Sequence, residues 1–455
     1  MDKELTVSYR VKEKISLREK TAYSMGAFAS NIVWSGVTAF STYYYTESVG
    51  IAAAAIGTMF VLSRVLDGIS DLIMGLILDR TKSRFGKARP WLLWMAIPFA
   101  IATMLLFAVP HSLGPLGRLV YAYITYNLLS TVVYTAINQG YCLLSVLITD
   151  NPKDRTSLNV FRMIGATLCA ILVNAIVMPM VNGFGGGPGA WTTTFLILSI
   201  IAAFMFFGAF AGTKERLTDT EKKREIVPVK TALLALVKNK HWWNRTLSNL
   251  IITIISATAA VNVFYAAYWL GNDTLGGFIT IINLLPMMLS LVFSTSLVEK
   301  FGKRNVCLIF SFIGLGGFVV QIIDPGSMAL TLAGQALRGL SLGPVSAVGF
   351  VMLADTIDYG EWKTGVRTEG LVFSSSSFGS KVGTGIGSAL VGWVLAWGGY
   401  IASAKVQADS VLNAILAVYI YIPAVLQVVS IILLFGYTLD KHLPKILRDL
   451  NNGAL

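Results

Sequence analysis

The stretch Arg64-Val65-Leu66-Asp67-Gly68-Ile69-Ser70-Asp71 places two carboxylates and a guanidinium within an apolar segment that is long enough to cross a membrane. In a helix, Asp67 and Asp71 lie on one face, one turn apart, and Arg64 lies one turn before Asp67. A charge at the bilayer centre costs about 3 kcal/mol on insertion scales, so three in one helix are not tolerated against lipid. We expect this face to line a polar cavity, where it binds a cation, carries a proton or forms a structural ion-pair cluster.

The composition also indicates a membrane protein. The chain is 55% hydrophobic and 13% charged, whereas soluble domains are about 25% charged. Its apolar runs match a hydrocarbon core about 30 Å thick, and their length without strict alternation predicts helices rather than a barrel. An all-α membrane protein with 12 transmembrane helices is therefore expected, with spans at 21–46, 52–78, 90–110, 116–148, 157–182, 191–212, 243–270, 275–297, 304–323, 328–354, 368–397 and 411–437.

The net charge of +12 is distributed as a topology signal rather than as a nucleic-acid interface. Basic residues fill the segment before the first span and the connections after spans two, six, eight and twelve, while the alternate connections are nearly bare. By the positive-inside rule, both termini are predicted to be cytoplasmic in the plasma (inner) membrane. The basic loops are also expected to contact anionic membrane lipids. The first apolar run is too long for a cleavable signal and predicts a retained helix.

The chain carries no pattern typical of an enzyme. Its three cysteines, Cys142, Cys169 and Cys307, all fall in apolar segments and predict neither a disulfide framework nor a metal site. A nucleophile elbow, a phosphate-binding glycine loop and an HExxH motif are absent from the sequence. We therefore expect no enzymatic activity and no cofactor other than a coupling ion.

An internal repeat predicts how the spans are organised. The polar stretch from about Thr213 to Lys240 separates six spans from six, and similar acid–base–aromatic-Gly-Lys segments follow spans two and eight. Two six-helix bundles with a basic central loop are the plan of the major facilitator fold, whose substrate lies at the midplane between the halves. The expected boundaries are 1–213 for the first bundle with the cation site, 214–242 for the cytoplasmic loop and 243–455 for the second bundle. The repeated acids either close a cytoplasmic gate or mark tight turns with topogenic charges.

Further polar side chains inside the spans predict a polyol site. These are Asn31, Tyr134, Thr135, Asn138, Arg162, Arg338 and Lys381, the last of which follows the run 374–377 of four serines. Amides and hydroxyls in spans often only bond other helices, whereas Arg162 and Lys381 are costlier to bury and favour a functional role. Aromatic faces for a sugar ring are available from Tyr134, Tyr265, Tyr268 and Trp269.

Several motifs together resemble the glycoside–pentoside–hexuronide cation symporters. They are Tyr23-Ser24-Met25-Gly26, Tyr43-Tyr44-Tyr45-Thr46, Gly57-Thr58, Arg64-x-x-Asp67-x-x-Ser70-Asp71, Arg84-Phe85-Gly86-Lys87-x-Arg89-Pro90-Trp91, Asp355-Thr356-Ile357-Asp358-Tyr359-Gly360-Glu361 and Lys381. The resemblance covers nearly the whole chain. It implies secondary active uptake of a sugar or glycoside together with Na⁺, H⁺ or Li⁺.

The resemblance also implies a set of site residues. Asp67, Asp71 and Thr135 match the family's cation site, and Ser70 stands where the family has an Asn ligand, which leaves Na⁺ and H⁺ open as the coupling ion. Around the substrate we expect Asn31, Arg64, Tyr134, Asn138, Arg162 and Lys381. The cytoplasmic gate is expected from Asp79, Arg84, Glu299, Arg304, Asp355 and Asp358.

Departures from the family pattern bear on the substrate. Asn31 and Asn138 replace two sugar-binding aspartates, and Cys142 and Ser346 replace sugar-stacking tryptophans. Without the two acids, the pocket repels an anion less, so a uronide becomes a candidate beside a neutral pentoside, and a galactoside is disfavoured. Lys381 is expected to act as a movable countercharge to Asp67 and Asp71. The alternatives are a proton-coupled or lysolipid carrier on the same fold, or a membrane sugar sensor without transport; a functional monomer is expected.

Overall fold

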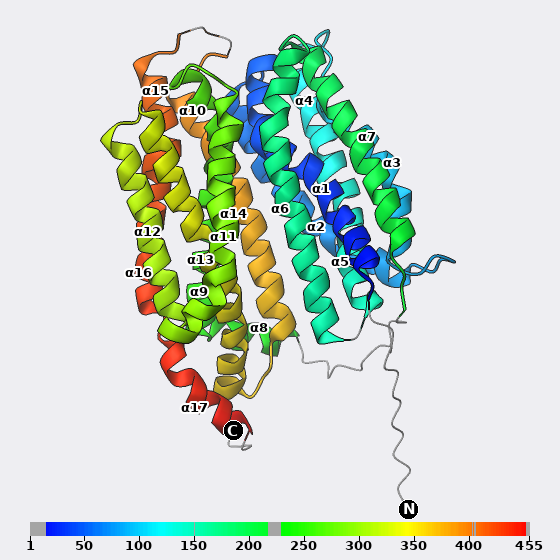
Figure 1. Cartoon of the computed structure of the whole chain (residues 1–455), viewed down its shortest axis with the longest axis vertical. Coiled ribbons are helices and arrows are strands. Elements are labelled where there is room, and N and C mark those ends of the chain that lie inside the picture. Colours follow the sequence, from blue (N-terminus) through cyan, green and yellow to red (C-terminus); the bar gives the residue numbers. More distant parts are fainter. Residues whose placement is uncertain (1–14, 150, 217–228, 403, 405, 452–455) are drawn as a thin grey trace, which may run out of the picture.

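The computed structural model describes residues 15–149, 151–216, 229–402, 404 and 406–451. The regular elements of these residues are all helices, which confirms the predicted all-α membrane fold (Figure 1). In chain order they are α1 (Leu17–Tyr43), η1 (Tyr44–Ser48), α2 (Ala53–Arg80), α3 (Arg89–Leu106), α4 (Pro115–Asn127), η2 (Leu128–Tyr134), α5 (Thr135–Ile148), α6 (Pro152–Gly183), α7 (Pro188–Gly212), α8 (Val229–Val237), α9 (Lys240–Ala257), η3 (Thr258–Val261), α10 (Asn262–Tyr268), α11 (Leu275–Phe301), α12 (Lys303–Ile323), α13 (Met328–Thr364), α14 (Glu369–Trp397), α15 (Asp409–Leu416), η4 (Ala417–Tyr421), α16 (Ile422–Gly436) and α17 (Leu439–Asn451).

Nine helical segments of the described residues are long and apolar enough to cross a membrane on length and composition alone. The other three predicted spans are formed by α1, α2 and α14, which are 27, 28 and 29 residues long. At 1.5 Å per residue each exceeds the thickness of a hydrocarbon core. The helix α2 carries the charged stretch 64–71. The sequence predicts site residues on all three helices, with Asn31 on α1, residues of the charged stretch on α2 and Lys381 on α14.

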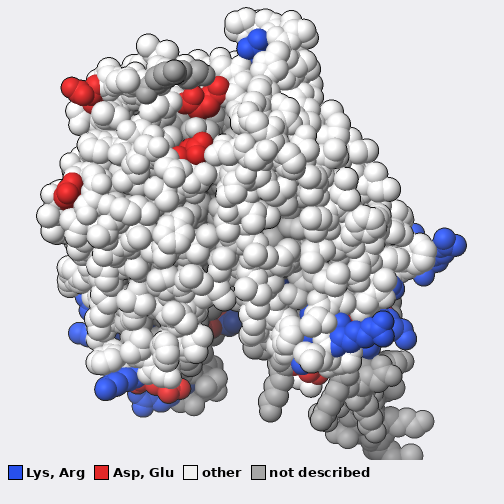
Figure 2. All heavy atoms as spheres, turned by 45° about the horizontal axis from the view of Figure 1, so that its top comes forward, with Lys and Arg blue, Asp and Glu red and all other residues white. Residues whose placement is uncertain are grey.

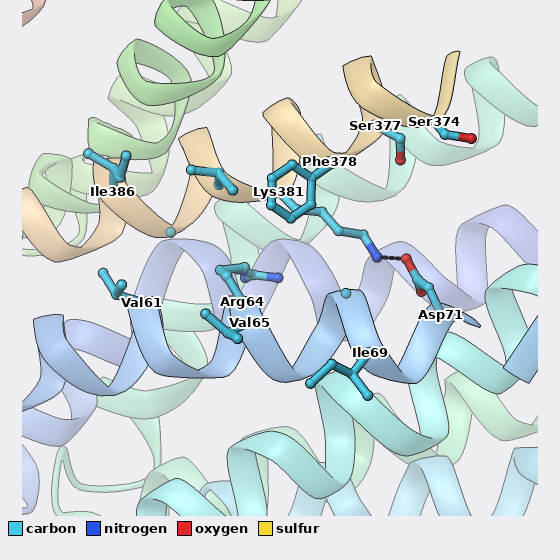
Figure 3. A pocket seen from close by; sticks show the side chains of 13 residues that line it. Val61, Arg64, Val65, Ile69, Asp71, Ser374, Ser377, Phe378, Lys381 and Ile386 are labelled. Carbon is cyan, nitrogen blue, oxygen red and sulfur yellow. Dashed lines mark hydrogen bonds and ion pairs between the residues drawn. The ribbon is translucent and has the colours of Figure 1, made fainter. Parts of the chain in front are cut away.

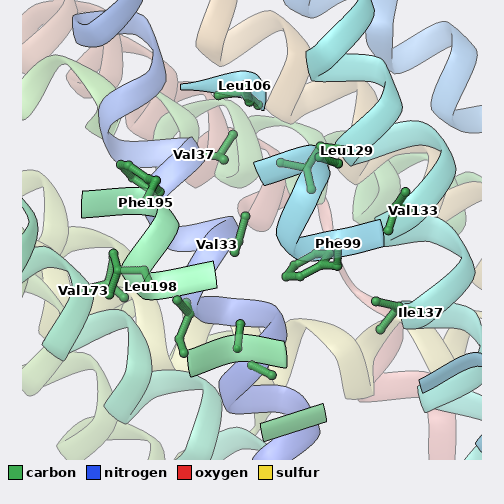
Figure 4. Packing of buried hydrophobic residues seen from close by; sticks show 14 of the residues in the cluster. Val33, Val37, Phe99, Leu106, Leu129, Val133, Ile137, Val173, Phe195 and Leu198 are labelled. Atoms are coloured by element: carbon green, nitrogen blue, oxygen red, sulfur yellow. The ribbon is translucent and has the colours of Figure 1, made fainter. Parts of the chain in front are cut away.

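The buried apolar side chains gather in two main cores. The first comes almost wholly from residues 15–209, and Figure 4 shows its packing around Val33, Phe99 and Phe195. The second comes mainly from residues 251–420. Each half of the chain therefore buries most of its apolar surface internally. Between the halves, α2 packs against α14 and α6 packs against α11.

The two halves are joined at the end of the molecule where α4, α10 and α15 lie, which is the top in Figure 1. There the carboxylate of Glu47 accepts hydrogen bonds from the hydroxyls of Tyr268 and Tyr400. The backbones of α6 and α11 approach each other closely at Gly277: a Cβ at this position would lie 1.8 Å from the carbonyl oxygen of Asn174. This end is therefore closed by contacts that a larger residue at position 277 would prevent.

Charge marks the opposite end. Helix α1 begins and α17 ends there (Figure 1), and Figure 2 shows lysine and arginine side chains gathered around it, with a hollow between the two halves. The described ends of the chain thus lie on one side of the molecule, as an even number of spans requires. The molecule is thus closed at one end and hollowed at the other.

Among the described residues, three spans are interrupted by a short stretch of another helix type, and a fourth ends in one. The π-helices η2 and η4 interrupt the fourth and twelfth predicted spans, the 3₁₀ turn η3 interrupts the seventh, and the π-helix η1 ends the first. A π-helix frees backbone carbonyls from the regular helical pattern, and such bulges often occur at functional sites. The segment predicted as a polar central loop also contains α8 (Val229–Val237), where Leu236 packs on Trp242 and Leu353. The apolar run at 233–237 explains this helix.

Candidate cation and sugar site

Asp67 is the more buried of the two carboxylates in the stretch 64–71, and both of its oxygens accept hydrogen bonds. Its residue is 4% exposed. Oδ2 accepts from Nη1 of Arg64 at 2.7 Å, one turn earlier on α2. Oδ1 accepts from the hydroxyl of Thr131 at 2.5 Å and lies 3.5 Å from the hydroxyl of Ser130. The carboxylate therefore lies between a guanidinium on its own helix and two hydroxyls of the fourth span.

The π-helix η2 explains why the fourth span meets α2 in this way. Ser130 and Thr131 lie within η2, and their backbone carbonyls accept from side chains: Thr131 O from the Ser70 hydroxyl, and Ser130 O from the Thr135 hydroxyl at 3.3 Å. Ser70 and Thr135, both predicted cation ligands, thus hydrogen-bond to the carbonyls of η2. The hydroxyls next to Asp67 belong instead to Ser130 and Thr131, which the sequence analysis missed. A hydroxyl pair one helical turn before Thr135 was the available signal.

Asp71 connects the two halves of the molecule. Its carboxylate forms an ion pair with Lys381, which reaches across from α14 (Figure 3). Nε2 of Gln139 donates to the backbone carbonyl of Asp71 at 3.0 Å and to Oδ1 at 3.3 Å. Each carboxylate of the stretch is thus paired with a basic side chain: Asp67 with Arg64 on the same helix, and Asp71 with Lys381 on the other half.

A cavity of about 650 Å³ lies between α2 and α14 at this ion pair. Its polar lining comes from Arg64, Asp71, Lys381, Ser374 and Ser377, and Phe378 contributes an aromatic face (Figure 3). Ligand pockets for small molecules occupy about 300–1,000 Å³. The cavity is therefore large enough for a sugar or a small glycoside beside the Lys381–Asp71 ion pair.

Aromatic rings surround the guanidinium of Arg64. Its Nη2 donates to the hydroxyl of Tyr126 at 2.9 Å, and its Cζ lies 5.3 Å from the centre of the Trp34 ring. Trp34 stacks on Tyr134 with 4.6 Å between ring centres. Trp34 was not among the predicted residues, although it lies one turn after Asn31. Arg64 and the Trp34–Tyr134 pair together offer a flat aromatic surface next to a charge.

Three other predicted substrate residues lie on α1, α5 and α6 and are not part of the lining of this cavity. Asn31 donates to the carbonyl of Ala27 at 2.9 Å on its own helix. Arg162 places Nη1 3.9 Å from the sulfur of Cys142, a long and weak contact. Asn138 is partly exposed. Tyr134, which stacks on Trp34 beside Arg64, lies one helical turn before Asn138.

The aromatic candidates of the second half have structural partners. Tyr265 is fully buried, stacks on Tyr419 and shares a hydrogen bond with Thr331. Tyr268 donates to Glu47 at the closed end. The indole of Trp269 donates to the carbonyl of Leu412 at 3.1 Å. The sequence offered no means to separate these packed rings from Trp34 and Tyr134.

The predicted gate residues of the first half lie at the basic end. Arg84 is exposed, with its guanidinium over the ring of Phe85. Asp79 belongs to the last turn of α2, and its side chain lies outside the described residues. The neighbouring loop is held by Glu215, whose carboxylate accepts from the backbone N–H groups of Lys87, Ala88 and Arg89 at 2.7–2.8 Å. Glu215 was not predicted, because its partners are 126 to 128 residues away in sequence.

Among the described hydrogen bonds and ion pairs, the predicted gate residues of the second half have partners only within that half. Asp355 pairs with Lys303 at 2.6 Å and Asp358 with Arg367 at 3.1 Å. The hydrogen bond to Glu361 is the main factor that raises the pKa of Arg367. Arg304 donates its side chain to the carbonyls of Leu434 and Phe435, and Glu299 is exposed. A gate formed between these residues and the first half remains a prediction.

Comparisons with known proteins identify the family. The sequence model described as MFS/sugar transport protein matches residues 22–441. The chain belongs to this family. The isoprimeverose transporter of Lactiplantibacillus pentosus is 37% identical over 96% of this chain and 92% of its own length. The inner membrane symporter YicJ of Escherichia coli K12 is 34% identical over 97% of this chain and 96% of its own. A glucuronide carrier protein homolog of the same organism is 30% identical, covering 97% and 96%.

A solved structure gives the same fold. The nucleoside transporter NupG, crystallised as a point mutant, superposes with a TM-score of 0.66 at 15% identity, covering 92% of this chain and 99% of that one. The resemblance to the glycoside–pentoside–hexuronide cation symporters is thus confirmed, and the protein is a multi-pass membrane transporter rather than an enzyme. As a member of this family it is a sugar or glycoside cation symporter, whose particular substrate and coupling ion are taken up below.

Proposed function

We propose that the protein takes up a glycoside with a monovalent cation by alternating access, and that Asp67 and Asp71 hold the cation. The observation that carries the proposal is the Lys381–Asp71 ion pair, which joins the two halves at the wall of the cavity. A cation that binds Asp71 competes with Lys381 and thereby changes a contact between the halves. Such a competition links cation binding to the conformational equilibrium.

The geometry suggests which atoms take part. Hard cations prefer several oxygen ligands, and the carboxylate of Asp67 with the hydroxyls of Thr131 and Ser130 supplies them within one cluster. Ser70 and Thr135 hold the η2 backbone against α2 and add their own oxygens. A proton requires only one carboxylate. We favour Na⁺, because a hydroxyl that donates to Asp67 still has lone pairs with which to coordinate a metal cation.

For the substrate we propose an acidic glycoside or a neutral pentoside. Arg64, Lys381 and Arg162 give the region an excess of positive charge, and Asn31 and Asn138 donate as well as accept hydrogen bonds. A sugar carboxylate is a natural bidentate partner for a guanidinium. The names of relatives point to both classes, since one is an isoprimeverose transporter and another is a glucuronide carrier homolog. Stacking on the Trp34–Tyr134 pair suits a sugar ring of either class.

The moving units and the orientation complete the proposal. We propose residues 1–213 and 243–455 as the two bundles, connected by 214–242, with both termini and the hollowed basic end in the cytoplasm. Asp79, Arg84, Glu299, Arg304, Asp355 and Asp358 then close that end when the carrier faces outward. The two cores and the cavity belong to a single chain, which is consistent with a functional monomer.

Transport in proteoliposomes tests this function. Uptake of a radiolabelled methyl glucuronide, a methyl xyloside and isoprimeverose is measured while the Na⁺ gradient and the pH gradient are varied separately. We expect accumulation of one of these sugars that is driven by the Na⁺ gradient and collapses when the gradient is dissipated. The variant Asn138→Asp should reduce uptake of the glucuronide more than uptake of a neutral glycoside, because a second carboxylate repels the first. Uptake that follows neither gradient would refute coupled transport.

A further inference from the structure

Arg245 is a buried guanidinium that lacks an acceptor for two of its nitrogens among the described residues. It lies in the second turn of α9, at the start of the seventh predicted span, and its residue is only 3% exposed. Nε and Nη1 are buried without any hydrogen-bond partner in the described part of the chain. Buried charges in proteins are almost always paired or hydrogen-bonded, because the loss of hydration is costly. An unpartnered guanidinium of this kind therefore points to a ligand.

The guanidinium faces a small pocket. Arg245 lines a space of about 80 Å³ together with Asn249, Ser346, Gly349 and Ser376. Gly349 on α13 is required for this placement, because a Cβ there would lie 2.5 Å from Nη2 of Arg245. Ser346 is exposed and so brings a hydroxyl to the opening. The pocket thus has a guanidinium in its wall and a polar opening.

The second half contains another buried guanidinium, that of Arg338, which does have hydrogen-bond acceptors. Arg338 on α13 donates from Nη1 to the side chain of Gln321 and to the carbonyl of Tyr419, each at 3.3 Å. It therefore has the acceptors that Arg245 lacks within the described residues. The described ion pairs include none to Arg245. Asp440 on α17 forms no ion pair with Arg245 among the described residues: its Oδ2 accepts from the backbone N–H of Arg304 at 2.7 Å, and its buried Oδ1 has no hydrogen-bond partner there.

We propose that Arg245, Ser346 and Ser376 form an anion-binding site in the second half, separate from the cavity at Asp71. Its size selects the ligand, because a water molecule takes about 30 Å³ in the liquid. The space of about 80 Å³ admits a compact monoanionic group such as chloride or a single carboxylate, and it excludes a whole sugar. In the first case Arg245, rather than Arg64 or Arg162, receives the carboxylate of an acidic substrate, and this case rests on the proposed function. In the second case the anion is a free ion, and the site does not depend on that function.

The rim residue Ser346 provides a test that leaves the buried arginine in place. In Ser346→Asp, the new carboxylate pairs with Arg245 and repels an external anion, whereas Ser346→Asn keeps a neutral side chain of similar size. Purified full-length protein is titrated calorimetrically with methyl β-glucuronide and with methyl β-glucoside. Thermal unfolding is then measured in sodium chloride and in sodium MES, whose anion is too large for the pocket. An anion that binds the folded state raises the unfolding midpoint.

We expect Ser346→Asp to weaken anion binding at least about tenfold, as the loss of a hydrogen bond to a charged group does, and Ser346→Asn to weaken it less. Tighter binding of the glucuronide than of the glucoside, lost in Ser346→Asp, assigns the anion to the substrate. A midpoint raised by chloride, with equal binding of both sugars, assigns it to a free ion. Both results support the site.

A second variant separates a binding role from a structural one. Arg245→Met removes the unpaired charge, so in sodium MES it should unfold at or above the wild-type midpoint, and chloride should no longer raise that midpoint. Lower stability of Arg245→Met in MES, together with no anion effect on the wild type, overturns the proposal. If the wild-type protein from this experiment, reconstituted into proteoliposomes, still accumulates a neutral glycoside in response to the Na⁺ gradient, then only the anion site is refuted and the proposed transport function stands.

Discussion

Replacement of Lys381 by Ala tests whether the ion pair between the halves competes with the coupling cation. In the structure, Lys381 and Asp71 form an ion pair while keeping 28% and 34% of their side chains exposed. Exposed ion pairs contribute up to about 1 kcal/mol, and breaking fully buried pairs costs about 3–5 kcal/mol. A half-buried pair should lie between these limits, at about 2 kcal/mol. Removing this competitor should strengthen cation binding at Asp71 by roughly 30-fold.

The assay is a calorimetric titration of the purified protein with Na⁺ and with Li⁺, followed by uptake in proteoliposomes. Lys300→Ala is the matched control, since it removes an exposed lysine of the same half far along the chain from the cavity lining. We expect tighter cation binding only in Lys381→Ala, and slower uptake, because the return step no longer has its countercharge. Equal cation affinities in the wild type and Lys381→Ala, with an unchanged dependence of uptake on pH and Na⁺, would refute the competition.

Three further variants test other contacts. Asp71→Asn should abolish cation-driven uptake while the protein stays folded and inserted, because the amide keeps the shape and removes the charge; uptake at the wild-type level contradicts the cation site. Glu47→Gln should reduce about tenfold the equilibrium constant that favours the state closed at this end, since charge-assisted hydrogen bonds are roughly twice as strong as neutral ones. The exposed Cys142 should then react more slowly with a maleimide. An unchanged labelling rate argues against this closure. Glu215→Ala should lower the unfolding free energy by about 2 kcal/mol, because three N–H donors lose a carboxylate; denaturant unfolding in detergent measures it, and an unaltered midpoint would show that the loop is held otherwise.

The positions of the spans and the charged face of α2 follow from the sequence because both depend on local physics. Apolar length decides which segments enter a bilayer, and helical periodicity decides that Arg64, Asp67 and Asp71 share a face. The resemblance then identified the family, which the comparisons confirm. The weakest local prediction was the central connection, where a short apolar run forms α8.

Tertiary structure decided which partners these residues have. The sequence predicted Ser70 and Thr135 beside the carboxylates, but the π-helix η2 turns Ser130 and Thr131 toward Asp67 and gives its carbonyls to the other two hydroxyls. A π-helix depends on packing against α2 and has no local signature of its own. The same holds for Trp34 under Arg64, for Glu215 at the loop after α2 and for Arg245, which the described residues leave unpartnered. The sequence therefore determined which charges enter the membrane, because each apolar span forms a helix that satisfies its own backbone hydrogen bonds and carries its charged residues with it. Only the packing of distant helices decided which of those charges find a partner within the protein.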